Sequence, residues 1–221
     1  MRTVQRELES ALKKLFQTRV KVAYASRTDS GVHAEAQVAN FLIDSKIPPV
    51  KILLGLNHYL PEDFSVTQAE EVTLNFHAQF SARWKTYEYR VLSDWARHPT
   101  HRFRSFQVFK PLNLRAMQDA ARLLKGTHDF RAFQASGSER KTTVRTIRRF
   151  KVSKNGKMIV FAVEANGFLY KMVRSLVGTL VKVGEGRLSL SELALILRKQ
   201  NRALIGETLP AHGLTLKKVT Y

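Results

Sequence analysis

The sequence predicts an α+β fold with two similar halves that share antiparallel sheet. The chain has 221 residues, of which 44% are hydrophobic and 25% charged, a composition typical of a globular protein with a sizeable core. Apolar residues alternate in some segments, as in strands, and recur at helical spacing in others. These strands and helices are expected in a similar order in both halves, although residue identities show no convincing repeat.

The first lobe is expected to cover residues 1–78 and to carry the loop with the first candidate site. Its opening helix is supported by Thr3, which can cap it, and by Lys13 and Lys14 near its end, where cations suit the helix dipole. The expected elements are, in order, a helix from Thr3 to Phe16, a strand at 20–25, a strand at 36–43, a short helix opened by Pro48-Pro49, and a strand from Phe64 to Val72.

The second lobe is expected to cover residues 79–221. Asn155-Gly156 favours a type I′ turn in a hairpin, and Gly184 is expected to stop a long apolar helix. The expected elements are, in order, a strand from Trp84 to Leu92, a helix from Asn113 to Leu124, hairpin strands from Arg145 to Ser153 and from Lys157 to Ala165, a helix from Phe168 to Val183, a helix capped by Ser189 or Ser191 that reaches Lys199, and a strand from Leu214 to Val219.

The charge balance indicates a polyanionic partner. There are 37 Lys and Arg residues against 18 Asp and Glu, which gives a formal net charge of +19. A domain this basic repels itself unless a polyanion neutralises it, and nucleic acid is the usual polyanion in a cell. An anionic membrane surface is the competing partner, but no apolar run approaches the roughly 20 residues of a membrane span. A merely basic surface stays open as an alternative.

The residue types and motifs that are missing exclude several kinds of chemistry. The lack of cysteine excludes disulfides, thiolate catalysis and cysteine-ligated zinc. His98 and His101 have a spacing that occasionally ligates metal, but we expect neither cysteine nor a carboxylate close by, and so no metal site. No Walker or Rossmann phosphate loop is present, so no nucleotide cofactor is predicted. The opening residues lack the apolar stretch of a secretory signal, and we expect a cytoplasmic protein.

The loop from Ser26 to Ala34 is the first candidate site. It lies between two expected strands, and Gly31 gives it access to positive φ, so an ordinary Asx-type turn is one interpretation. The other is a functional site, because Asp29 lies two positions from Arg27. An arginine beside a carboxylate keeps it ionised, which suits a nucleophile better than a general acid. An ordinary ion pair is equally compatible with this spacing.

Two further segments could bind or position a substrate. Tyr87 and Tyr89 share one face of their expected strand, and aromatic rings on a sheet can support an unstacked base; core tyrosines are the alternative. Arg174 falls within the apolar surface of an expected helix, where a charge needs a partner, and we nominate Asp29. Arg174 could instead pair with another acid or extend to solvent.

A basic run follows Ser136 and could line a surface that tracks phosphates. It is spread over an expected loop and strand, and a solvated charged face is the alternative. Its members are Arg140, Lys141, Arg145, Arg148, Arg149, Lys151 and Lys154.

Taken together, these segments resemble the tRNA pseudouridine synthase A family. The loop from Ser26 to Ala34 is similar to the active-site motif G-R-T-D-x-G-V-H-A, with Asp29 at the catalytic position and a serine in place of the usual first glycine. Tyr87 matches the substrate-stacking tyrosine, and Arg174, within F-L-Y-K-M-V-R-S-L-V-G, matches the basic residue that pairs with the aspartate. Further matching segments are Gly126–Phe130 and Pro210–Leu214. The resemblance therefore spans almost the whole chain.

The resemblance implies a fold and a reaction. The fold is two ferredoxin-like or RRM-like lobes sharing a largely antiparallel sheet with helices on one side, here without the first strand of the N-terminal lobe. The reaction is isomerisation of uridine to pseudouridine at positions 38, 39 or 40 in the anticodon arm of tRNA, by a homodimer without cofactor or metal. The enzyme flips the uridine out of the RNA, and its aspartate forms a covalent adduct at ribose C1′ or at uracil C6.

The resemblance also implies roles for single residues, with Asp29 and Arg174 as the catalytic pair. Arg27 is expected to fill the gap left by the flipped base. The expected substrate contacts are Tyr87, Arg27, His33 and Phe168, and the expected RNA contacts are Arg140, Lys141, Arg145 and Lys171. Two other functions stay open: a non-catalytic basic RNA-binding protein, such as a truncated and inactive synthase, and a carboxylate-based nucleosidase or nuclease.

Overall fold

The computed structural model describes residues 2–137 and 142–221 and divides the chain into two compact units. The smaller unit joins the residues up to Ser26 with Val38–Ser81. The larger unit joins Arg27–Gln37 with Ala82–Tyr221. From the sequence we expected the candidate loop in the first lobe, whereas here it belongs to the larger unit. Strand pairing with the C-terminal end of the chain is the reason, as described below.

The smaller unit is built around two helices that pack against each other. α1 (Val4–Phe16) begins after Thr3, whose hydroxyl accepts a hydrogen bond from the Arg6 amide, as the sequence predicted for a cap. α2 (Pro49–Tyr59) lies against α1 and contributes to the same apolar core. The buried residues of this core are Leu8, Ala11, Leu12, Val20 and Leu56.

Strands in the smaller unit are shorter than the sequence predicted. β1 (Ala23–Tyr24) and β3 (Ala39–Asn40) pair antiparallel in place of the longer strands expected on both sides of the candidate loop. The predicted strand from Phe64 to Val72 is wrong, because these residues lie outside any strand. Asn57 explains part of this, since its side-chain amide bonds both the N–H and the carbonyl of Val66 at 2.7 and 2.8 Å and takes the place of a strand partner.

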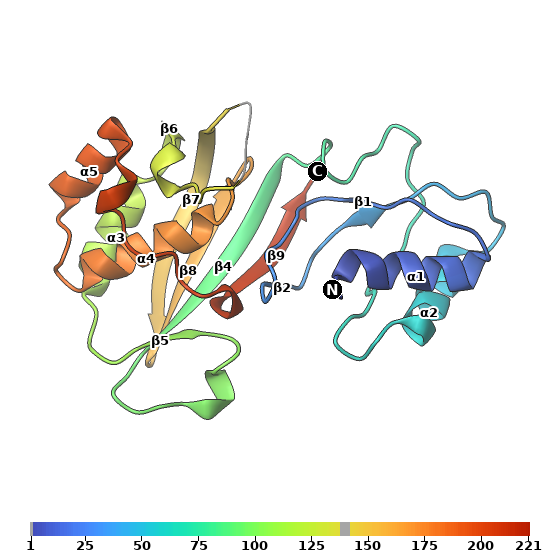
Figure 1. Ribbon diagram of the computed structural model, residues 1–221, viewed down its shortest axis with the longest axis horizontal. Coiled ribbons are helices and arrows are strands. Elements are labelled where there is room, and N and C mark those ends of the chain that lie inside the picture. The colour runs from blue at the N-terminus through green and yellow to red at the C-terminus, as the bar shows by residue number, and fades with distance from the viewer. Residues whose placement is uncertain (1, 138–141) are drawn as a thin grey trace. The chain divides into compact units, whose positions relative to one another are not determined.

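The larger unit contains, within the described part of the chain, a seven-stranded mixed sheet (Figure 1). Its order is β2-β9-β4-β8-β7-β6, and β5 pairs with β4 outside this path. Pairs β4-β8, β4-β9, β7-β8 and β6-β7 are antiparallel, while β2-β9 and β4-β5 are parallel. The strands are β2 (His33–Ala34), β4 (Trp84–Ser93), β5 (Phe106–Val108), β6 (Gly126–Asp129), β7 (Val144–Asn155), β8 (Met158–Ala165) and β9 (Leu214–Thr220).

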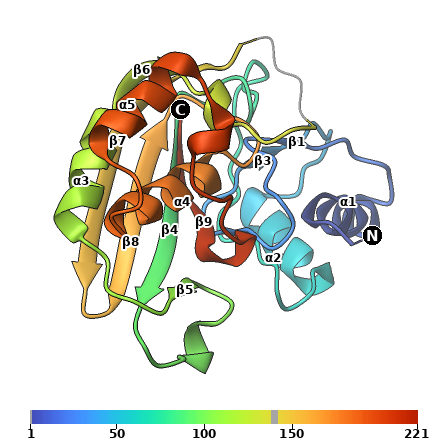
Figure 2. The same cartoon turned by 60° about the vertical axis from the view of Figure 1, so that its left-hand side comes forward.

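Helices cover one face of this sheet. Burial alternates along β8, so that one face of the sheet carries the core and the other does not. α4 lies against β4, and α3 lies against β7, α4 and α5 (Figures 1 and 2). The helices are α3 (Leu114–Leu123), α4 (Met172–Gly184) and α5 (Leu190–Lys199). The predicted α+β class is confirmed, but the two units carry separate sheets.

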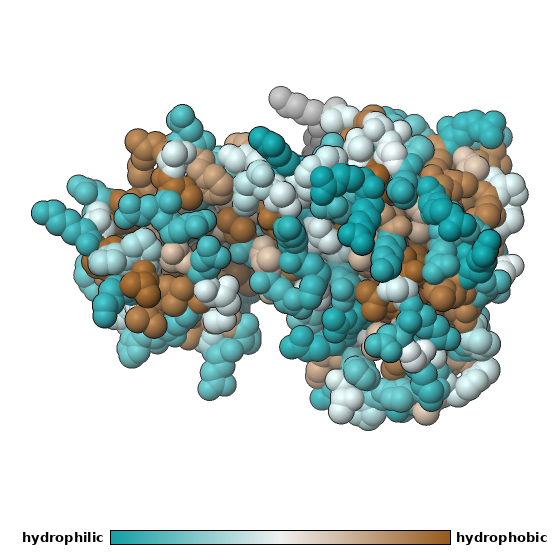
Figure 3. Space-filling model, turned by 180° about the vertical axis from the view of Figure 1, so that it is seen from behind, coloured by the Kyte–Doolittle hydropathy of each residue, from teal (hydrophilic) through white to brown (hydrophobic). Residues whose placement is uncertain are grey.

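The opposite face of the sheet is polar. Charged side chains alternate there with the buried residues of the strands, and hydrophilic side chains are numerous over this unit in the rear view of Figure 3. Examples are Glu88, Arg90, Arg149, Lys151, Glu164 and Lys217. No helix among the described residues has the length and apolar character that crossing a membrane requires.

The hairpin of β7 and β8 turns differently from the prediction. Asn155 pairs with Met158, so Gly156 and Lys157 are the central residues of the turn. Among these described residues only Gly156 has a positive φ, 56°, whereas a type I′ turn needs positive φ at both central positions. The predicted type I′ turn is therefore wrong, and glycine at the first central position fits type II′.

Candidate active site

The candidate loop is a tight turn that leads directly into β2. The Val32 amide donates to the Asp29 carbonyl at 3.1 Å, and Gly31 has φ +82°, the left-handed conformation that glycine allows. β2 then pairs with β9, which places His33 opposite Thr215. This pairing anchors the loop at the residues that follow it, so the turn holds the Asp29 backbone in a defined place.

Arg174 binds the carboxylate of Asp29. Its Nη1 donates to Asp29 Oδ2 at 2.7 Å, and the two side chains are 13% and 23% exposed. Charge-assisted hydrogen bonds of this length are among the stronger polar contacts in proteins. The partner that the sequence nominated for Arg174 is thus in contact with it, across 145 positions of the chain.

The helix that carries Arg174 begins later than predicted. α4 starts at Met172, and Lys171 before it has φ 57° and ψ 13°, in the left-handed region. The predicted start at Phe168 is therefore wrong, because a left-handed residue interrupts the helical path. Phe168 instead precedes the helix and packs, partly buried, against the core. Arg174 consequently lies in the first turn of α4.

A second hydrogen bond fixes the guanidinium of Arg174. Its Nε donates to the Leu209 carbonyl at 2.6 Å. The chain before Leu209 lies directly on α4 at Gly178, where an added Cβ would come within 1.9 Å of the Glu207 carbonyl oxygen. This contact could not be predicted from the spacing of the residues alone. The glycine within the matching helix motif was the available signal, because close backbone approach requires glycine.

Tyr89 supports the segment around Leu209 from within the core, a role that the sequence did not predict. It is fully buried at 0% exposure, and its hydroxyl donates to the Pro210 carbonyl at 2.7 Å. Its ring fills the space at Gly213, where an added Cβ would lie 2.6 Å away. Burial raises the pKa of Tyr89 above its ordinary value, and the nearby charge of Arg174 opposes this only in part. Tyr89 is therefore a neutral donor that holds the backbone beside Arg174.

Tyr87 lies on the same face of β4 and contacts Phe168. The two ring centroids are 5.2 Å apart with the planes at 88°, an edge-to-face contact. Tyr87 pairs with Val163 on one side and Leu216 on the other, in the middle of the sheet, and is only 5% exposed. The structure thus brings two predicted substrate contacts together, and little of the tyrosine ring is accessible.

His33 and Arg27 lie on either side of the Asp29 turn and differ in their contacts. His33 Nε2 is 2.7 Å from the Phe103 carbonyl, so this ring nitrogen donates to backbone. Arg27 is exposed, and no hydrogen bond or ion pair joins its side chain to another described residue. Arg27 is therefore available to an external partner, whereas His33 already has a backbone partner.

The remaining predicted RNA contacts are spread over the larger unit. Lys171 Nζ lies 4.9 Å from the centroid of the Tyr170 ring. Arg145 donates through Nη1 to the carbonyls of Thr142 and Val144 at 3.0 and 2.6 Å. Two further predicted contacts, Arg140 and Lys141, lie outside the described residues.

His98 contacts a carboxylate that the sequence analysis did not expect. Its Nε2 lies against Asp94 Oδ2, and Lys157 donates to the same oxygen at 2.7 Å. These hydrogen bonds hold the pKa of Asp94 well below its usual range. The expectation that no carboxylate lies close by is wrong. In the described part of the chain, no group of three or more His, Cys, Asp or Glu side chains could hold a metal ion.

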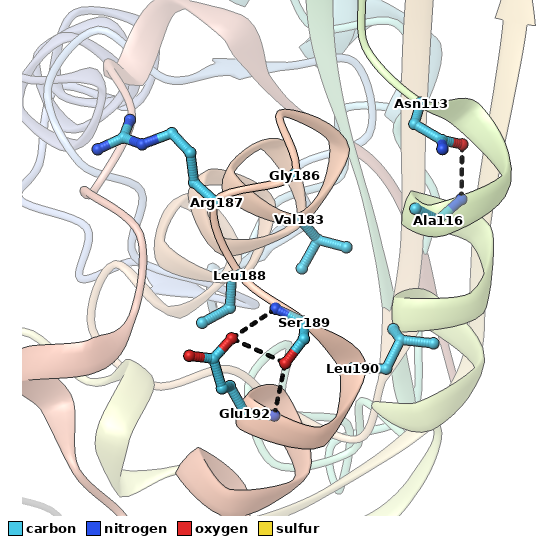
Figure 4. Close-up of a pocket in the computed structure, with 9 residues that line it drawn as sticks. All are labelled: Asn113, Ala116, Val183, Gly186, Arg187, Leu188, Ser189, Leu190 and Glu192. Carbon is cyan, nitrogen blue, oxygen red and sulfur yellow. Dashed lines mark hydrogen bonds between the residues drawn. The ribbon is translucent and has the colours of Figure 1, made fainter.

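A surface pocket lies at the connection between α4 and α5 (Figure 4). Within it Ser189 and Glu192 form a capping box, since the Ser189 amide donates to the Glu192 carboxylate at 2.7 Å and the Glu192 amide donates to the Ser189 hydroxyl at 3.2 Å. Ser189 is therefore the cap of α5. The residues that line the pocket are Asn113, Ala116, Val183, Gly186, Arg187, Leu188, Ser189, Leu190 and Glu192. None of them belongs to the Asp29 site.

The fold and the ion pair between Asp29 and Arg174 define a basic α+β protein whose candidate active site holds a carboxylate. Comparison with known proteins identifies its family. The tRNA pseudouridine synthase family matches residues 1–81 and 120–221. The chain therefore belongs to the tRNA pseudouridine synthase family and is an isomerase of that family.

Individual relatives support this membership over nearly the whole chain. A tRNA pseudouridine synthase A of Thermoanaerobacter pseudethanolicus is 46% identical over 219 residues, which are 99% of this chain and 90% of the relative. The corresponding protein of Ruminiclostridium cellulolyticum is 45% identical over 221 residues, 100% of this chain and 90% of the relative. That of Acetivibrio thermocellus is 41% identical over 220 residues, with the same coverage.

Proposed function

We propose that this protein converts uridine to pseudouridine at positions 38, 39 or 40 in the anticodon arm of tRNA, with Asp29 as the nucleophile. The observation that carries the proposal is the 2.7 Å contact between Asp29 Oδ2 and Arg174 Nη1. Family membership and a net charge of +19 support tRNA as the substrate. The three positions follow from the resemblance of the Asp29 loop to the family motif.

Arg174 holds one oxygen of the carboxylate and leaves the other available. Oδ2 accepts the bond from Arg174, while no described residue donates to Oδ1. An ionised carboxylate oxygen can attack carbon directly, whereas a protonated acid is a poor nucleophile. The guanidinium also compensates the negative charge in a position with limited access to water. Asp29 Oδ1 is therefore the atom that we assign to the attack.

The proposed reaction moves the glycosidic bond within a single nucleotide. Asp29 Oδ1 bonds to ribose C1′ or to uracil C6, and the bond between N1 and C1′ breaks. The uracil turns, C5 bonds to C1′, the bond to Asp29 breaks, C5 loses a proton and N1 gains one. Substrate and product then have the same atoms, and the steps require neither a cofactor nor a metal.

Four other residues take supporting roles in this proposal. Flipping a uridine costs a few kcal/mol of stacking, which contacts to the base and to the vacated space offset. We assign Tyr87 and Phe168 to the base, because their rings contact each other, and Arg27 to the vacated space and its phosphate, because it is exposed. We assign His33 a positioning role through its hydrogen bond to the Phe103 carbonyl. The proposed RNA contacts remain Arg140, Lys141, Arg145 and Lys171.

The proposal includes a homodimer that works in the cytoplasm. Both features follow from the resemblance to the family, and neither is used in the argument for Asp29. Analytical ultracentrifugation of the purified protein tests the dimer: a monomer at micromolar concentration contradicts that part of the proposal.

The test is incubation with unmodified tRNA transcripts that carry uridine at only one of positions 38, 39 and 40. Chemical mapping is expected to find pseudouridine at the remaining uridine in at least one of these transcripts, and none in a transcript without them. Free uracil or cut strands would indicate a nucleosidase or nuclease. Bound RNA without any product would indicate a non-catalytic binder. Each of these results contradicts the proposal.

A further inference from the structure

One loop carries several exposed aromatic rings and arginines. It lies outside the parts of the chain that match the family. It runs from Trp95 to Arg104, between β4 and β5, and is called the basic-aromatic loop below. Trp95 and Phe103 are 74% and 63% exposed, and Arg97, Arg102 and Arg104 are exposed as well. The loop contains no acidic residue. It projects from the sheet next to β5 (Figures 1 and 2).

Hydrogen bonds hold the basic-aromatic loop in a defined shape. A single 3₁₀ turn at Pro99–His101 lies in its middle, and the His101 carbonyl accepts from the Ser105 hydroxyl at 3.1 Å. Gln107 Nε2 donates to the Asp94 carbonyl at 3.2 Å and closes the base of the loop. Side chains on a loop that is already ordered lose less freedom when they bind a partner, and this favours binding.

The acid that directly precedes the loop does not neutralise its arginines. Asp94 is 8% exposed, and its carboxylate is occupied by Lys157 and His98. None of the loop's arginines forms an ion pair within the described residues. Arg102 instead lies over the Phe103 ring, with its guanidinium carbon 4.3 Å from the ring centroid. Glu35 acts on Arg104 only through a longer-range attraction, so the loop presents a net positive charge next to exposed aromatic surface.

Two histidines tie this loop to the elements that hold Asp29 and Arg174. His33, at the start of β2 after the Asp29 turn, donates to the Phe103 carbonyl at 2.7 Å. His212 donates at 3.1 Å to the carbonyl of Ser105, the residue directly after the loop, and it follows the segment whose carbonyls bind Arg174 and Tyr89. The loop is thus fixed from both sides of the catalytic pair, so a ligand on it would lie at a set place relative to Asp29.

We propose that the basic-aromatic loop binds unpaired nucleotides of the tRNA next to the target uridine. Trp95 and Phe103 stack on bases, and Arg97, Arg102 and Arg104 contact phosphates. Exposed rings interleaved with arginines suit single-stranded nucleic acid, in which bases are free to stack and phosphates are close. A second copy of this chain fits less well, because a symmetric contact would bring the same arginines together. This inference rests on the proposed function.

The experiment compares RNA affinity between loop variants and matched controls. The double variant Trp95→Ala with Phe103→Ala removes the rings, and Phe80→Ala, at a similarly exposed ring outside the loop, is the control. The probes are an anticodon stem-loop RNA and a fully paired RNA of the same length. We expect the double variant to bind the stem-loop at least about thirtyfold more weakly, since each stacked base contributes about fivefold or more and two rings are removed. Binding to the paired RNA is expected to stay within about twofold, because stacking on a ring needs an unpaired base.

A charge variant tests the phosphate contacts separately. Arg97→Ala, Arg102→Ala and Arg104→Ala combined should lower the slope of log affinity against log salt by roughly 2, at about 0.7 per phosphate on a single strand. Arg115→Ala, a mainly exposed arginine on α3, is the control and should leave the slope unchanged.

The outcomes separate this inference from the proposed function. Stem-loop affinity within about twofold of the Phe80→Ala control overturns the loop proposal even if pseudouridine forms. Loss of the dimer with RNA affinity kept overturns it as well, and assigns the loop to a contact between copies. Weaker stem-loop binding in a protein that forms no pseudouridine supports the loop as an RNA site and contradicts only the proposed reaction.

Discussion

Arg174 Nη1 lies 2.7 Å from Asp29 Oδ2, and the same guanidinium donates through Nε to the Leu209 carbonyl at 2.6 Å. The arginine is thus held by backbone on one side and holds the carboxylate on the other. Because the planar guanidinium presents its donors in a fixed fork, the direction of the Asp29 side chain follows from the position of Leu209.

Replacing Arg174 by lysine should separate the effect of orienting the Asp29 carboxylate from the effect of the positive charge. Arg174→Lys keeps the positive charge, but one ammonium group cannot occupy both the Nε and the Nη1 positions. We expect the single-turnover rate of pseudouridine formation to fall roughly a hundredfold, the scale of a misplaced catalytic group. Affinity for tRNA should stay within about twofold, because the net charge is unchanged. A rate equal to that of the Arg115→Lys control would contradict the orienting role.

Removing the hydroxyl of Tyr89 should loosen the segment Leu209–Pro210, which orients Arg174. Tyr89→Phe leaves the partly buried Pro210 carbonyl without its 2.7 Å donor. We expect the free energy of unfolding to fall by about 1–2 kcal/mol at pH 7, measured by urea denaturation. Pseudouridine formation should slow as well, since the Leu209 carbonyl next to Pro210 orients Arg174. Unchanged stability and rate together would show that this hydrogen bond does not support the site.

The stability difference between wild type and Tyr89→Phe should depend on pH in one direction. Burial raises the pKa of Tyr89 above its ordinary value of 10.0, so the folded state keeps the phenol proton where the unfolded state loses it. The wild type therefore loses stability as the pH rises above about 10, and the variant lacks this loss. Urea denaturation at pH 8 and above pH 10 should show that the two proteins differ less in their free energy of unfolding at the higher pH. A difference that widens contradicts the buried, neutral phenol.

Gly178→Ala should separate α4 from the segment that carries Leu209. The added methyl would lie 1.9 Å from the Glu207 carbonyl oxygen, and backbone has to move to make room. We expect a loss of about 1–3 kcal/mol in the free energy of unfolding, together with loss of activity. Gly167→Ala is the matched control, because its nearest contact would be an ordinary 3.5 Å to the Arg145 side chain. Equal stability of the two variants would contradict the close packing described for Gly178.

Much of the larger unit could be predicted because its elements carry local signals. The helix expected from Asn113 onward is α3, which Asn113 caps through its side chain, and the alternation from Trp84 onward gives the central strand β4. The Asp29–Arg174 contact could be nominated because a charge within an apolar helix surface needs a partner. The lengths of the strands in the smaller unit were overestimated, since side chains such as Asn57 replace strand partners there.

The contacts that support the site could not be predicted, because they join backbone of distant segments. Tyr89 to Pro210 and His33 to Phe103 are side chain to carbonyl bonds, and any residue supplies a carbonyl. Local patterns therefore do not mark them. The left-handed Lys171 at the start of α4 was missed for a similar reason, since lysine rarely adopts that conformation and gives no hint of it.

The most direct test of the central claim is pseudouridine formation by Asp29→Asn beside Glu35→Gln. Both changes neutralise a carboxylate, but Glu35 forms a surface pair with Lys217, and its side chain is 54% exposed. Mapping of a tRNA with uridine at positions 38 to 40 should show no pseudouridine with Asp29→Asn although the RNA still binds, and wild-type levels with Glu35→Gln. Pseudouridine formed by Asp29→Asn at the wild-type rate would contradict Asp29 as the nucleophile.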